Sequence, residues 1–227
     1  MSEHNFLYLI WKNPNTRRNF TVGKLTKDDK YRFEYCEEYK MALDSGWKLL
    51  EAFPEEKEYT SQELFAAFAC RLPDRKRRNI KDILKKYNLS DYDGYELLKR
   101  SSGRLPIDTY EFVDPIFSED EIIEKDFYIV GVRYLSGCEG TECTKRTYVS
   151  VGDMLQLLPE TTNKFDQYAI KVLTTDNHEL GYIPRYYSKS ISIRLKNGMS
   201  YSLEVIDKDA NESCESCIKV RLKMPKK

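Results

Sequence analysis

The sequence predicts an α+β protein of two domains, with a small sheet and helices in residues 1–118 and a small OB-like β-barrel with one helix in residues 119–227. In the first half, short aromatic strands precede a run of helical segments. From residue 127 onward, short strands separated by turn residues dominate, a pattern typical of small barrels. The stretch between, residues 105–126, contains Pro106, Pro115 and an acidic patch, which together indicate a domain junction.

The elements of the first half follow from local patterns. Strands are expected over residues 6–11, 20–25 and 31–35, and the last of these alternates aromatic with charged side chains, as a half-buried strand does. Glu63 follows Thr60 at the spacing of a capping box, which predicts a helix beginning there. Further helices are expected over residues 38–45, 75–87 and 93–100.

The second half is expected to be mostly strand. One helix is predicted over residues 186–197, ending at Gly198. The predicted strands cover residues 127–134, 146–151, 153–158, 168–174, 178–183, 200–206 and 216–222.

The charge of the chain restricts how it binds any nucleic acid. Its 227 residues carry 37 Lys or Arg and 37 Asp or Glu, a formal net charge of zero. Proteins that coat duplex DNA are usually basic, so we expect weak binding, binding in a small local pocket, or none. Residues 71–78 form one strongly basic cluster. No signal peptide or membrane-spanning stretch is apparent, so a cytoplasmic protein without membrane contact is expected.

Several segments of the second half resemble the HIRAN domain, a small β-barrel module that binds nucleic acid. They are Val130-Gly131-Val132-Arg133-Tyr134, Asn163-Lys164-Phe165-Asp166-Gln167-Tyr168-Ala169-Ile170-Lys171-Val172 and Gly181-Tyr182-Ile183-Pro184. The resemblance implies binding of single-stranded DNA or of a DNA 3′ end. It assigns base stacking to Tyr134 and Phe165, a phosphate or stacking cation to Arg133, and the acceptor for the terminal hydroxyl to Asp166.

Two more cations, Lys164 and Arg185, are expected to add phosphate contacts, since a pocket of this kind needs few charges. A second interpretation of the same residues stays open. Phe165 would then be a core residue and Asp166 would close a turn through its own backbone. On that interpretation the domain would contact protein and no longer bind DNA.

The first half resembles the amino-terminal subdomain of HipA-type kinases. The residues that carry this resemblance are Val22-Gly23-Lys24-Leu25, Tyr31-Arg32-Phe33-Glu34-Tyr35 and the segment from Tyr59 to Asp74. It implies a detached regulatory or docking piece, of the kind found in bacterial toxin–antitoxin systems, with a protein partner bound through residues 1–118.

Neither a catalytic grouping nor a cofactor is predicted. The chain has no Gly-rich phosphate loop, and His4 and His178 are not part of a recognisable triad. We therefore expect a non-enzymatic adaptor that binds DNA, or alternatively a regulatory module that binds protein. Four of the six cysteines could form a zinc site, although independent reduced thiols are favoured: Cys138, Cys143, Cys214 and Cys217.

Overall fold

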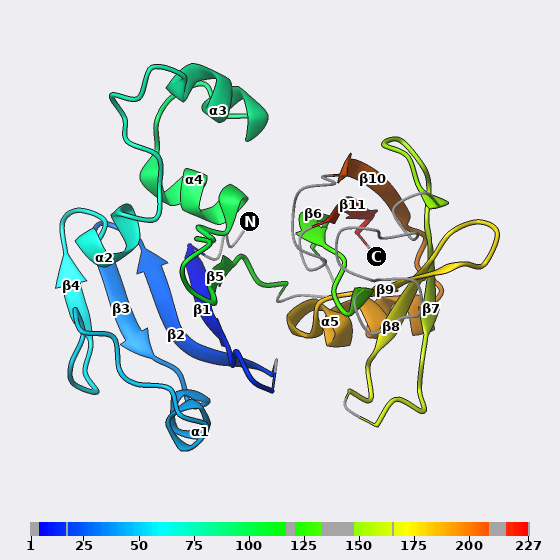
Figure 1. Ribbon diagram of the computed structural model, residues 1–227, viewed down its shortest axis with the longest axis horizontal. Helices are drawn as coiled ribbons and strands as arrows, with labels where there is room; N and C mark the ends of the chain where they lie inside the picture. The colour runs from blue at the N-terminus through cyan, green and yellow to red at the C-terminus, as the bar shows by residue number, and fades with distance from the viewer. Residues whose placement is uncertain are drawn as a thin grey trace. The chain divides into compact units, whose positions relative to one another are not determined.

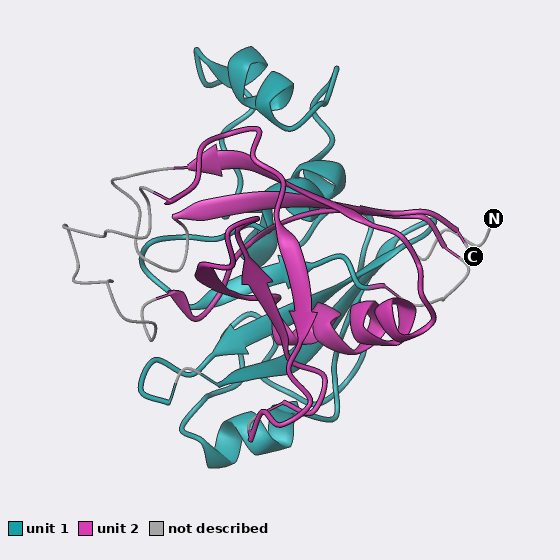
Figure 2. Cartoon of the chain, turned by 90° about the vertical axis from the view of Figure 1, so that its right-hand side faces the viewer, with its two compact units in different colours: residues 1–115 teal, residues 116–227 magenta. Residues whose placement is uncertain are grey.

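The computed structural model describes residues 5–16, 18–116, 121–132, 148–164, 166–208 and 217–226. The chain divides into two compact units, residues 1–115 (unit 1) and 116–227 (unit 2), which Figure 2 colours separately. The division falls close to the predicted junction, and independent folding of two domains stays a prediction. Within the described ranges, none of the helices combines the length and apolarity that spanning a membrane requires.

Unit 1 is built on one antiparallel sheet of five strands in the order β4-β3-β2-β1-β5 (Figure 1). Buried and partly buried side chains alternate along much of its strands, and the inward side chains include Leu7, Phe20 and Phe33. The strands are β1 (Phe6–Lys12), β2 (Asn19–Lys27), β3 (Tyr31–Tyr35), β4 (Tyr59–Ser61) and β5 (Tyr110–Val113).

Four short helices complete the part of unit 1 that the structure describes: α1 (Tyr39–Asp44), α2 (Ala66–Ala69), α3 (Ile80–Lys86) and α4 (Gly94–Ser101). The carboxylate of Asp93 caps α4 by accepting the backbone N–H groups of Tyr95 and Glu96. An aromatic core lies against the sheet, with the ring centres of Phe33 and Phe53 4.4 Å apart. Packing of this core, more than helix propensity, therefore holds α1, α2 and α4, helices of four to eight residues, in place.

Two predictions for this half were wrong. Thr60 does not begin a helix, because it pairs with Arg32 in the sheet while Tyr59 lies opposite Phe33. The helix begins at Ala66, and the hydroxyl of Ser61 accepts the Glu63 N–H instead. The stretch 105–126 is also not only a connector, since it contains β5, which pairs with β1, and the start of β6.

The described residues of unit 2 form two three-stranded antiparallel sheets and one helix, α5 (Arg185–Lys196). The sheets have the orders β10-β11-β6 and β7-β8-β9, and are connected by isolated bridges between Val130 and Tyr182 and between Met154 and Glu204. The strands are β6 (Ile123–Tyr128), β7 (Gln156–Pro159), β8 (Ile170–Leu173), β9 (Glu179–Tyr182), β10 (Ser202–Lys208) and β11 (Ile218–Met224).

Among the described residues these strands do not form the closed barrel that the sequence predicted. They form two sheets connected by isolated bridges. Both sheets direct fully buried side chains inward, among them Ile170, Val172, Leu203 and Val220. The predicted helix over residues 186–197 is confirmed as α5, and its inward face includes Tyr187 and Ile191. The described part of the predicted strand 146–151 is not a strand.

Candidate functional site

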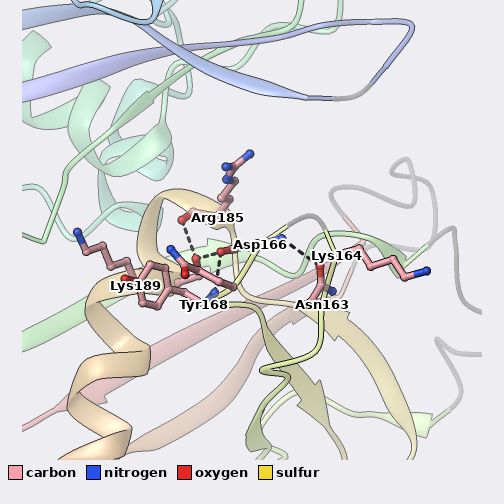
Figure 3. Close-up of a pocket in the computed structure, with 8 residues that line it drawn as sticks. Asn163, Lys164, Asp166, Tyr168, Arg185 and Lys189 are labelled. Carbon is pink, nitrogen blue, oxygen red and sulfur yellow. Dashed lines mark hydrogen bonds between the residues drawn. The ribbon is translucent and has the colours of Figure 1, made fainter.

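A surface pocket of about 500 Å³ lies in unit 2, between the loop that joins β7 to β8 and the first turns of α5 (Figure 3). Most of its lining side chains are polar or charged. They are Asn163, Lys164, Asp166, Gln167, Tyr168, Arg185, Ser188 and Lys189.

Two short side-chain turns shape the loop that forms one wall of the pocket. Asn163 Oδ1 accepts the backbone N–H of Asp166 (3.1 Å), and Asp166 Oδ1 accepts that of Tyr168 (2.9 Å). Asn and Asp favour such turns because their short side chains reach backbone two or three residues ahead. One oxygen of Asp166 therefore has a structural role, as the second interpretation of the sequence proposed.

The loop is attached to the sheet through Glu160. Its Oε2 accepts hydrogen bonds from Asn163 Nδ2 (2.6 Å) and the Tyr182 hydroxyl (3.1 Å), and its Oε1 lies 3.1 Å from Lys171 Nζ. The Asn163 hydrogen bond, with those from Lys171 and Tyr182, holds the pKa of Glu160 below its usual value. The hydrogen bond of Lys171 to Glu179, and to a smaller extent that to Glu160, raises the pKa of Lys171. The network favours an ionised Glu160, and its interactions fix the position of Asn163.

The helix α5 supplies the opposite wall. The hydroxyl of buried Ser188 lies 2.7 Å from Asp166 Oδ2 and 2.8 Å from the carbonyl oxygen of Arg185. Since a hydroxyl has one proton, it donates to only one of these acceptors at a time. When it donates to the Arg185 carbonyl, Asp166 Oδ2 is available to accept a hydrogen bond from a ligand.

The rim of the pocket is positively charged. Lys164, Arg185 and Lys189 are exposed, and none forms an ion pair with any residue that the structure describes. Figure 3 shows the Arg185 and Lys189 side chains extending outward from α5, and Lys164 extending from the loop on the other side. Lys189 Nζ lies 5.9 Å from the centre of the Tyr168 ring. The arrangement offers cations for phosphate, an aromatic face and an acceptor for a hydroxyl.

The structure brings together three of the predicted site residues, Lys164, Asp166 and Arg185. The other three, Arg133, Tyr134 and Phe165, lie outside the described residues. Sequence reasoning missed the contributions of Tyr168, Ser188 and Lys189. Ser188 and Lys189 follow Arg185 by three and four positions, and all three share one face because α5 begins at Arg185, one residue before the predicted helix.

The zinc prediction is not tested by the described residues. Cys217 is buried immediately before β11, whereas Cys138, Cys143 and Cys214 lie outside the described part of the chain. Where the structure is described, no three Cys, His, Asp or Glu side chains group as metal ligands would.

Comparison with protein families finds the HIRAN domain at residues 122–224. This match confirms the HIRAN domain predicted from the sequence. The comparisons give no support to the predicted resemblance between residues 1–118 and the front subdomain of HipA-type kinases. No curated protein matches the chain.

Three solved structures overlap with part of the chain. The crystal structure of the HIRAN domain of human HLTF is 19% identical, covers 44% of this chain and 74% of its own, and has a TM-score of 0.36. A protein from Lactobacillus plantarum is 24% identical, with coverages of 46% and 95% and a TM-score of 0.39. The HLTF HIRAN domain in its DNA-bound conformation is 18% identical, with coverages of 47% and 76% and a TM-score of 0.32.

Proposed function

We propose that the chain uses its HIRAN domain, residues 122–224, to bind single-stranded DNA at a 3′ end, as a non-enzymatic adaptor. Family membership supports DNA as the ligand, because the HIRAN domain of HLTF has a DNA-bound conformation. The observation that carries the proposal is the pocket rim, where three exposed cations surround a single carboxylate, that of Asp166.

The charges of the rim fit a terminal nucleotide. Lys164, Arg185 and Lys189 contact its phosphates, since charge-assisted hydrogen bonds to phosphate are roughly twice as strong as neutral ones. The Tyr168 ring offers a face for a base, and stacking of this kind contributes about 1–3 kcal/mol per base. A pocket that engages so few phosphates is compatible with zero net charge.

Recognition of the terminal hydroxyl depends on Asp166 and Ser188. As the 3′ hydroxyl enters, the Ser188 proton turns to the Arg185 carbonyl, 2.8 Å away, and Asp166 Oδ2 accepts the hydroxyl of the DNA. A 3′ phosphate at the same place would bring its negative charge against the carboxylate. The pocket therefore discriminates a hydroxyl end from a phosphorylated end.

One observation favours the alternative function, a domain that contacts protein and has lost DNA binding. Both oxygens of Asp166 are already engaged within the domain, by the Tyr168 N–H and by the Ser188 hydroxyl. A carboxylate with this role alone would close the loop and attach it to α5. A protein partner bound through residues 1–118 would then define the function.

Two lysines on α5 provide a matched test. Lys189→Gln removes a cation at the pocket, and Lys196→Gln removes one from the last turn of the same helix. Binding of single-stranded DNA, followed by fluorescence anisotropy from 50 to 200 mM salt, should weaken for Lys189→Gln. The slope of log K against log salt should fall by about 0.7, the value for one phosphate contact.

Lys196→Gln should leave both the affinity and the slope as in the unchanged protein. Equal behaviour of the two variants would refute binding at the pocket. The non-enzymatic part of the proposal is checked in the same samples, because the labelled DNA should be recovered unaltered after prolonged incubation.

A further inference from the structure

A second concentration of positive charge lies in unit 1, far along the sequence from the pocket. Residues 74–86, which we call the basic lobe, contain seven Lys or Arg and two Asp, although the whole chain has zero net charge. The segment consists of a turn after Pro73 followed by α3. In Figures 1 and 2, α3 lies at one end of unit 1, beyond α4.

The basic lobe has a defined backbone. The Asp74 carboxylate accepts the Lys76 N–H (2.6 Å), which closes the turn, and Leu84 is buried with 6% exposure. The Arg100 guanidinium donates to the carbonyl oxygens of Tyr87 and Asn88 at 3.1 and 3.2 Å, which attaches the end of α3 to α4. The cations of the lobe are therefore displayed on ordered backbone.

Six of the seven cations are exposed and not neutralised by a described residue. No ion pair to a described residue is formed by Arg75, Lys76, Arg77, Arg78, Lys81 or Lys85, all of which are exposed. Several other basic side chains of the molecule are paired with a carboxylate. Arg71 forms two hydrogen bonds with Asp108, and on β11 Arg221 pairs with Asp126.

Folding alone does not account for this charge. Lys81 and Lys85 lie one turn apart on α3, an arrangement of like charges that costs about 0.2–0.5 kcal/mol. Arg75 to Arg78 precede the helix, where the macrodipole disfavours positive charge. The attraction of these cations to a bound anion would offset both costs.

The chemistry of the surface indicates nucleic acid as that partner. Protein interfaces usually have an apolar or aromatic centre, but no large apolar side chain of the lobe is exposed. Successive cations separated by few residues suit the regular charges of a phosphate backbone. The Arg75 guanidinium lies 4.8 Å from the centre of the Tyr92 ring, which adds a cation–aromatic platform beside the charges.

We propose that the basic lobe is a second nucleic-acid-binding surface, which contacts the phosphate backbone without regard to sequence or to strand ends. Binding by the basic lobe does not depend on the end-binding pocket of unit 2. The cations of the lobe are on unit 1, and they require no terminal nucleotide.

Circular single-stranded DNA tests the lobe separately, since it has no end for the pocket to bind. We expect the full chain to bind it in a salt-dependent manner. For the double variant Lys81→Gln/Lys85→Gln, the slope of log K against log salt should decrease by about 1.4, from two phosphate contacts at about 0.7 each. Lys81→Arg/Lys85→Arg should retain the slope.

The control Lys40→Gln/Lys48→Gln removes the same charge from exposed positions elsewhere in unit 1 and should have no effect. An equal decrease of the slope in the control variant, or no binding of circular DNA, would refute the proposal that the basic lobe binds nucleic acid. So would binding of polyglutamate as tightly as DNA, because the surface would then be a general site for anions. Equal affinity for linear and circular single-stranded DNA would refute end binding by the pocket without affecting the proposal for the basic lobe.

Discussion

Replacing Asn163 by Asp should reverse how acidity affects the stability of the pocket loop. The variant retains the Oδ1 acceptor for the Asp166 N–H, but places a carboxylate oxygen where the amide nitrogen lies 2.6 Å from Glu160 Oε2. A donor that stabilises ionised Glu160 is thus exchanged for a second negative charge at the same place.

The loss of stability in Asn163→Asp is estimated from Coulomb's law, and proton uptake by one of the two carboxylates sets its upper limit. Two unit charges at this separation repel by roughly 6 kcal/mol at an effective dielectric constant near 20. Protonation of one carboxyl from a pKa near 4 limits the cost at pH 7 to about 4 kcal/mol. Lys171, 3.1 Å from the other oxygen of Glu160, offsets part of this. We expect a loss of about 2 kcal/mol at pH 7.

The sign of the pH dependence distinguishes the two proteins. The pKa of Glu160 is lowered in the folded chain, so its stabilisation is complete above the unfolded value near 4.3 and is lost as pH falls through the folded pKa. In the variant the shared carboxyl pair has a raised pKa, so stability increases as pH falls from 7 to 5. The unchanged protein should be nearly constant over that interval.

Hydrogen exchange of peptides covering residues 156–183, corrected for intrinsic rates, measures this effect. Tryptophan fluorescence does not, because Trp11 and Trp47 are both in unit 1. Asn163→Ala is the control, since it removes the hydrogen bonds of the side chain to Glu160 and to the Asp166 N–H without adding charge, and should shift stability by a similar amount at pH 5 and pH 7. Parallel pH profiles for Asn163→Asp and Asn163→Ala would refute the role of Glu160.

Two further substitutions test the packing of each unit. Asp108→Asn should destabilise unit 1 by about 2–4 kcal/mol, because it breaks a pair with Arg71, whose side chain is only 8% exposed. Urea unfolding followed by tryptophan fluorescence would measure this change. A loss of stability no larger than for an Asp→Asn substitution at an exposed position would contradict it. Gly181→Ala should destabilise unit 2 by about 2–4 kcal/mol, since its φ is +144° and a Cβ would lie 2.5 Å from the Val130 carbonyl oxygen. Hydrogen exchange of β8 and β9 measures it, and unchanged protection would contradict the close approach.

Local patterns predicted the elements whose neighbours are close in sequence. The strands β1, β2 and β3 follow one another as hairpins. In β3 the predicted alternation of aromatic and charged residues holds, with Phe33 buried and Glu34 exposed. By contrast, β5 lies about a hundred residues from its partner β1, and its flanking prolines gave the appearance of a linker. Pairing between distant strands is decided by the tertiary fold and leaves little signal in a short window.

For the same reason, the sequence predicted only part of the site. Asp166 and Lys164 lie in one segment with a recognisable pattern, whereas Ser188 meets Asp166 only because α5 packs against the loop. The basic cluster at residues 71–78 was visible as charge, but the sequence did not separate its members. Arg71 is an internal partner of Asp108, and the exposed cations begin at Arg75.

The most direct test of end binding compares one fluorescent single-stranded oligonucleotide with a 3′ hydroxyl and with a 3′ phosphate. A hydrogen bond to a charged group contributes about 1.5–3 kcal/mol, so we expect the hydroxyl form to bind at least about tenfold more tightly. Ser188→Ala should preserve this preference and Asp166→Asn should abolish it. Equal affinity for the two ends in the unchanged protein would contradict the proposal that this HIRAN domain captures a DNA 3′ end.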